Sequence, residues 1–113
     1  MTQDPNDEAS FNVHSGEIVT VTVDSIKTNC LTAAAFNGTA VTKASSNPDK
    51  YTFPVSGASG QEFVFACVCT FAAADPPDAC YTIAVSSFGS SFTLTPVYKE
   101  SPEASFTLFF TVS

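Results

Sequence analysis

The sequence predicts an all-β fold, a single-domain antiparallel β-sandwich of about seven to nine short strands. Three observations lead to this prediction. Apolar and polar residues alternate through most of the apolar runs, and a period of two is typical of half-buried strands. Clusters of Gly, Pro, Asn, Asp and Ser separate those runs at short intervals, as turns do. Helix signals are nearly absent, because the only helix-like stretch, residues 31–36, is too short for a stable amphipathic helix.

Alternation places the half-buried strands along the chain. A leader strand is expected at residues 11–14. Five further alternating runs are expected as strands at residues 17–24, 51–55, 81–86, 92–95 and 105–112. In the first of these, Val19, Val21 and Val23 share one face. Pro54 cannot donate a backbone hydrogen bond, so the strand that contains it is expected at a sheet edge.

One segment, residues 62–71, is apolar on both of its faces. One face carries Phe63, Phe65, Cys67, Cys69 and Phe71, and the other carries Val64, Ala66 and Val68. A strand of this kind is typical of a sheet centre, where both faces are covered. The segment is therefore expected to be a central strand, with Phe65 buried in the core.

The charge of the chain limits its partners. The 113 residues suit a single domain, only 13% of them are charged, and the formal net charge is −7. All four basic residues are lysine, so nucleic acid is not expected as a partner, because binding it begins with cations that neutralise phosphates. No apolar run approaches the roughly 20 residues that cross a bilayer, so membrane insertion is not expected either. A protein or a glycan remains as the candidate partner.

The first ten residues differ from the rest of the chain. Residues 1–10 are polar and acidic, and we expect a flexible polar tail there, followed by a β-sandwich domain at 11–113. This composition is the opposite of a signal peptide, which has a basic region followed by an apolar one. The protein is therefore either cytosolic or an exported chain whose signal peptide is absent from this sequence. Four cysteines in so small a chain favour an extracytoplasmic protein: secreted, periplasmic or on the cell surface.

Two short motifs resemble a known family of surface modules. Residues 79–85, Ala-Cys-Tyr-Thr-Ile-Ala-Val, follow an acidic turn and resemble the late strand of bacterial immunoglobulin-like and PKD-like modules. Residues 16–23 are similar to the "G-x-x-V-T-V-x-V" strand near the start of such modules. The resemblance implies an immunoglobulin-like sandwich in an extracytoplasmic setting, without a catalytic residue. The antibody signature itself is missing, because the chain has no tryptophan.

The cysteines, Cys30, Cys67, Cys69 and Cys80, are expected to form disulfides. If residues 62–71 and 79–86 formed a hairpin, Cys69 would lie opposite Cys80, and Cys30 would be left for Cys67. The set Cys30–Cys69 with Cys67–Cys80 differs from this one by a two-residue slip and stays open. A Cys67–Cys69 bridge would be strained, because alternate residues of a strand lie too far apart. Buried free thiols are the alternative, and the C-x-C spacing disfavours zinc.

No residue pattern indicates catalysis, a cofactor or a metal. The only histidine, His14, is expected at a strand end on the surface, where it would not activate a Ser or Cys nucleophile. The pairs Asp75/Asp78 and Glu100/Glu103 could supply oxygen ligands to calcium, but they match no calcium loop and are typical of solvated turns. We therefore expect a protein that is not an enzyme.

Two places are candidates for partner binding. Asp75, Pro76, Pro77 and Asp78 form a loop that its two prolines stiffen, and in a sandwich such loops cluster at the ends. Phe109 points away from its apolar neighbours, so it belongs either to an exposed apolar patch or to a face that another element covers.

These features predict a non-catalytic, secreted or cell-surface module that binds or adheres to a partner through its loops. One alternative is a carbohydrate-binding module of an exported enzyme system, which would carry exposed aromatic side chains on a sheet face. Another is a small secreted protease-inhibitor-like protein, which would present an extended, disulfide-braced loop at residues 72–79.

Overall fold

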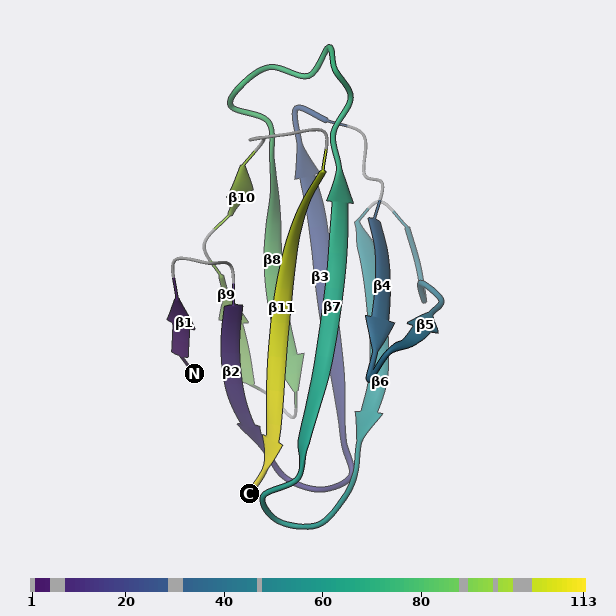
Figure 1. Cartoon of the computed structure of the whole chain (residues 1–113), viewed down its shortest axis with the longest axis vertical. Coiled ribbons are helices and arrows are strands. Elements are labelled where there is room, and N and C mark those ends of the chain that lie inside the picture. Colours follow the sequence, from purple (N-terminus) through teal and green to yellow (C-terminus); the bar gives the residue numbers. More distant parts are fainter. Residues whose placement is uncertain are drawn as a thin grey trace.

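The computed structural model describes residues 2–4, 8–28, 32–46, 48–87, 90–94, 96–98 and 103–113. Over these ranges the chain contains strands and turns but no helix, and therefore no helix long and apolar enough to cross a membrane. The strands form two sheets that pack together as a sandwich (Figure 1). The prediction of an all-β fold is thus confirmed.

The first sheet has six strands. Their order across the sheet is β1 (Thr2–Asp4), β2 (Glu8–Val13), β11 (Glu103–Val112), β7 (Glu62–Thr70), β4 (Thr32–Phe36) and β5 (Thr39–Val41). Neighbouring strands are antiparallel, except that β2 runs parallel to β11. The sequence had predicted a purely antiparallel sandwich, and the parallel pairing of β2 with β11 corrects that prediction.

The second sheet has five strands. It is ordered β10 (Val97–Tyr98), β8 (Cys80–Ser87), β3 (Glu17–Ile26) and β6 (Asp49–Val55), with β9 (Ser90–Thr93) also paired to β8. The strand that contains Pro54, β6, lies at an edge of this sheet, as predicted, because proline cannot donate to a further strand.

Alternating side chains from both sheets fill the core. Val19, Val21 and Val23 of β3 are fully buried, and they belong to the same core cluster as the buried side chains of β7. Aromatic rings join the two layers: Phe53 of β6 stacks on Phe65 of β7 with ring centroids 5.2 Å apart. β7 lies between β11 and β4, which confirms that it is a central strand. Its outer face is not covered by another described element.

The predicted hairpin between residues 62–71 and 79–86 is wrong. β7 belongs to the first sheet and β8 to the second, so the intervening residues 71–79, which we call the crossing loop, pass from one layer to the other. β7 cannot pair with β8, because β4 and β11 already occupy both of its edges. The hydroxyl of Tyr81 joins the layers instead, by donating to the carbonyl oxygen of Thr70 at 2.5 Å.

Two further segments differ from the sequence expectation. The structure pairs Thr2–Asp4 with Glu8–Ser10, so the described part of residues 1–10, expected as a tail, belongs to the first sheet. In β2, Ala9, Phe11 and Val13 alternate inward and are held by the parallel edge of β11. The described part of the helix-like stretch at 31–36 is strand β4, because pairing with β7 gives it inter-strand hydrogen bonds that stabilise it more than a short helix would be.

Candidate functional site

The crossing loop projects from the upper end of the sandwich in Figure 1. It folds into two turns, in which the amide of Asp75 donates to the carbonyl of Ala72 at 3.1 Å and the amide of Ala79 donates to that of Pro76 at 3.0 Å. Phe71 and Ala79, at its two ends, are buried in the core. Firm anchors at both ends and two internal turns favour a single loop conformation.

Both loop carboxylates are bound within the protein. The hydroxyl of Thr28, just after β3, donates to Asp75, whose Oδ2 also accepts the amide of Ala72 at 2.8 Å. Asp78 forms an exposed ion pair with Lys27. This hydrogen bond lowers the pKa of the Asp78 carboxyl and raises the pKa of the Lys27 ammonium. The carboxylates therefore tether the loop to the end of β3.

These tethers bear on the calcium alternative. Within the described ranges, no three acidic, His or Cys side chains come together as a metal site would require. Glu100 lies outside the described residues, as does the side chain of Glu103. Pro76 and Pro77 are exposed in the loop, while the Asp75 and Asp78 carboxylates are engaged by Thr28 and Lys27.

A buried polar cluster lies at the same end of the molecule and was not singled out from the sequence. Asp49, at the start of β6, is only 1% exposed, and its Oδ2 accepts the hydroxyl of Thr32 at 2.6 Å. Lys43 pairs with the same oxygen at 3.0 Å, and the hydroxyl of Tyr51 lies 2.6 Å from that of Thr32. The cluster joins β4 of one sheet to β6 of the other, so its role is structural.

The predicted Cys69–Cys80 disulfide is wrong. Cys69 and Cys80 are buried free thiols, and they lie on strands of different sheets. Cys67 and Cys69 lie 4.4 Å apart, and no disulfide joins them. Cys30 lies outside the described residues. Burial, and secondarily the negative charge of Asp78, raises the pKa of the Cys80 thiol, which disfavours its reactive thiolate form.

A thiol assay tests this assignment. We expect iodoacetamide to alkylate Cys69 and Cys80 in denatured protein that has not been reduced, and to modify them slowly in the folded protein because both are buried. Chymotrypsin, which cleaves after Phe71, places the two cysteines on different peptides, and mass spectrometry of these peptides gives the two yields. Recovery of a Cys69–Cys80 linked peptide before reduction would show that the pairing predicted from the sequence exists after all.

Phe109 lies apart from the crossing loop. It is half-buried on the outer face of the first sheet, where it pairs with Val64 of β7. Val64 lies about 20 Å along β7 from Thr70, where the loop begins, at roughly 3.3 Å per residue. Val68, on the same outer face, is 38% exposed, and no described element packs over it. The structure therefore does not bring the two predicted binding places together.

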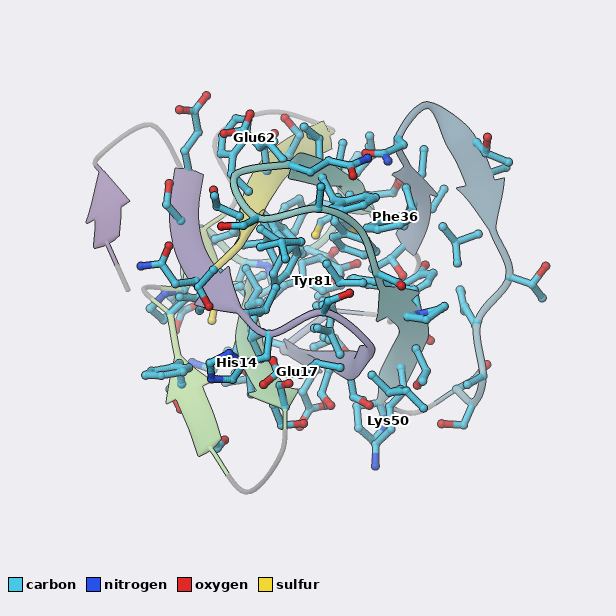
Figure 2. All side chains as sticks on the ribbon, turned by 90° about the horizontal axis from the view of Figure 1, so that it is seen from below. His14, Glu17, Phe36, Lys50, Glu62 and Tyr81 are labelled. Carbon is cyan, nitrogen blue, oxygen red and sulfur yellow. The ribbon has the colours of Figure 1, made fainter. Side chains whose placement is uncertain are left out.

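A cleft opens between the sheets at the opposite end, with a volume of about 330 Å³. Its lining includes Phe11, His14, Glu17, Ser87 and Phe92. His14 is exposed just beyond the end of β2, as predicted, and its Nδ1 lies 3.3 Å from the hydroxyl of Ser113. Figure 2 shows His14 and Glu17 close together, and the amide of Glu17 donates to the carbonyl of His14 at 3.2 Å.

Glu17 is the functional candidate that sequence reasoning missed. The signal was its position, two residues before Val19, which places it on the inward face of β3. No family model, curated protein or solved structure matches this chain. Its function is therefore inferred from the crossing loop and the cleft. The end of β2, which lines the cleft, lies at the opposite end of the sandwich from the crossing loop (Figure 1).

Proposed function

We propose that the chain is a non-catalytic binding module, a secreted or cell-surface accessory domain that holds a protein partner through its crossing loop. One observation carries the proposal: both loop carboxylates are engaged within the protein, so the loop is fixed before any partner arrives. A loop that is already ordered loses little conformational entropy on contact, and the partner's affinity rises accordingly.

The chemistry of the loop tip favours a protein over a glycan. Its exposed side chains are Ala72, Ala73, Ala74, Pro76, Pro77 and Asp78, and Asp78 is already paired with Lys27. All but Asp78 are apolar. These small apolar groups complement an apolar protein surface, whereas sugars are usually held by aromatic faces and by several hydrogen-bonding side chains. The inhibitor-like alternative is disfavoured, because the loop is turned rather than extended and no disulfide between Cys69 and Cys80 braces it.

Strand order supports an immunoglobulin-like arrangement, which we propose for the fold. The pair β3–β6 corresponds to strands B and E of an immunoglobulin domain, and the series β4–β7–β11 corresponds to C, F and G. The chain departs from that pattern because β8, β9 and β10 intervene between β7 and β11. The crossing loop is part of this insertion, so it is a feature added to the sandwich.

The side chains that could act as nucleophiles support a role without catalysis. Cys69 and Cys80 are buried, and burial raises the pKa of the Cys80 thiol. His14 contacts Ser113, but the nearby Glu17 carboxylate accepts a hydrogen bond from Ser87 instead of orienting the imidazole. A serine nucleophile needs a base that is itself held by a third group.

Replacing residues 75–78 with Gly-Ser-Gly-Ser tests the loop proposal. We expect a screen of glycan and surface-protein arrays to identify a protein partner that the wild type binds and the variant binds about tenfold more weakly or worse, because both tethers and the diproline are lost. The control is Phe109→Ser, which alters the outer sheet face and should leave binding unchanged. A ligand that tolerates the loop replacement but is lost in Phe109→Ser would contradict the proposal. If that ligand is a glycan, the carbohydrate-binding alternative takes its place.

A further inference from the structure

The cleft places one carboxylate among aromatic and aliphatic side chains. Strands β2 and β11 contribute Phe11 and Phe110 from the first sheet, while β8 and β9 contribute Val85 and Phe92 from the second. Glu17 reaches the cleft from the first residue of β3. Asn12, His14 and Ser87 add further polar groups to the lining. A pocket that combines apolar side chains with converging polar groups is the usual form of a small-ligand site, and about 330 Å³ lies within the range of such sites.

Glu17 occupies a position where the fold would otherwise place an aliphatic residue. It shares the inward face of β3 with Val19 and Val21, and it is only 8% exposed. Its Oε2 accepts the hydroxyl of Ser87 at 2.8 Å, which is a neutral donor. A buried carboxylate is costly unless a positive charge compensates it. A local departure from core patterning of this kind is typical of functional sites.

No described residue forms an ion pair with Glu17, and the His14 imidazole, which lines the same cleft, contacts Ser113. The ion pairs in the described ranges join Lys27 to Asp78 and Lys43 to Asp49, and neither includes a residue of the cleft. The net charge of −7 makes the surroundings favourable to a cation and unfavourable to an anion.

The rings around Glu17 also favour a cation. Phe11 contacts Phe92 with ring centroids 5.6 Å apart and stacks on Phe110 at 5.3 Å. Phe92 is 39% exposed, so it borders the opening of the cleft. The faces of aromatic rings attract ammonium and guanidinium groups, and their apolar surface accommodates the hydrocarbon stem that carries such a group.

We propose that this cleft binds an organic cation, an alkylammonium or guanidinium group on an apolar stem. Glu17 is the counter-ion, the phenylalanines hold the stem, and Ser87 fixes the carboxylate. The same chemistry is present in a Lys or Arg side chain of a protein and in a free small amine. The site lies away from the crossing loop and does not depend on the function proposed for that loop.

Titrations monitored by amide NMR shifts test the proposal on the intact chain. The cationic probes are N-acetyl-arginine methylamide, which represents a protein side chain, and benzamidine and n-butylammonium, which represent free amines. N-acetyl-norleucine methylamide is the neutral control. We expect saturable shifts at Asn12, Glu17 and Ser87 with a cationic probe and at least about tenfold weaker binding of the neutral control. Tighter binding of the arginine derivative would indicate a protein source, and tighter binding of the free amines would indicate a metabolite.

Two variants test the roles of the Glu17 charge and of the Phe92 ring in cation binding, and a third variant is the control. Glu17→Gln keeps an acceptor for Ser87 but removes the charge, so it should weaken cation binding about tenfold or more. The control is Glu62→Gln. Glu62 is exposed, and in Figure 2 it lies near the upper edge, whereas Glu17 lies in the lower part. This substitution changes the net charge equally and should leave binding unchanged. Phe92→Ala should weaken binding several-fold without loss of folding, because that ring is partly exposed.

Three results would overturn the proposal. The first is a wild-type protein that binds none of the cationic probes. The second is equal affinity for the cationic and neutral probes, and the third is unchanged cation affinity in folded Glu17→Gln protein. Replacing residues 75–78 with Gly-Ser-Gly-Ser should not alter cation binding, so a failure here remains distinct from a failure of the crossing-loop proposal.

Discussion

Replacing Phe65 with alanine should lower the free energy of unfolding by about 3–5 kcal/mol. The side chain is fully buried in β7 and contacts rings from both sheets. Its ring centroid lies 5.2 Å from that of Phe53, 5.6 Å from that of Tyr51 and 6.2 Å from that of Phe106. Truncation removes this buried area and leaves a cavity that a close-packed core cannot fill. Urea denaturation of both proteins measures the difference.

Phe109→Ala is the matched control, because it makes the same chemical change on the opposite face of the same sheet. Phe109 is half-buried on the outer face, so its truncation should cost well under half as much. A loss below about 1 kcal/mol for Phe65→Ala, or similar losses for the two variants, would show that the core does not lie where the structure places it.

Replacing Asp49 with alanine should lower the free energy of unfolding by about 3 kcal/mol. Asp49 is almost completely buried and accepts from Thr32 while pairing with Lys43. The substitution removes a charged hydrogen-bond acceptor and leaves the half-buried lysine without its counter-ion. The measurement is again the unfolding free energy, with near-ultraviolet circular dichroism to confirm native packing around Tyr51.

Asp78→Ala provides the comparison, since it removes another aspartate that is paired with a lysine. Asp78 and Lys27 are both more than half exposed, and water screens such pairs strongly. The free energy of unfolding should hardly change. Equal effects at Asp49 and Asp78 would contradict the structural role assigned to the buried cluster.

Local patterns predicted most of the longer strands, but not β4 or the short strands β1, β5 and β10. Alternation located β3, β6, β8 and β11, the double apolar faces identified β7 as central, and Pro54 identified an edge. These properties depend on which face of a strand is buried, and the sequence period reports that directly. β4 was missed because its alanine-rich sequence carries little alternation and depends on its pairing with β7.

Sheet membership and the cleft were beyond local reasoning. Whether two consecutive strands form a hairpin or belong to different sheets depends on which distant strands compete for their edges. The 71–79 connection could therefore not be assigned, and the Cys69–Cys80 pairing failed with it. The crossing loop was recognised from its prolines, but Glu17 was not, because an acidic residue at a strand start is ordinary until its side chain is known to face inward.

The parallel pairing of β2 with β11 has a consequence for synthesis of the chain. Phe11 aligns with Phe110, so the register of the first sheet joins residues from nearly opposite ends of the sequence. On a ribosome, β2 has no long neighbour until the last strand has emerged, although β3, β6 and β8 can already associate. Topologies dominated by such non-local contacts fold slowly. The nascent polypeptide should therefore stay open, and accessible to chaperones, until translation has passed β11.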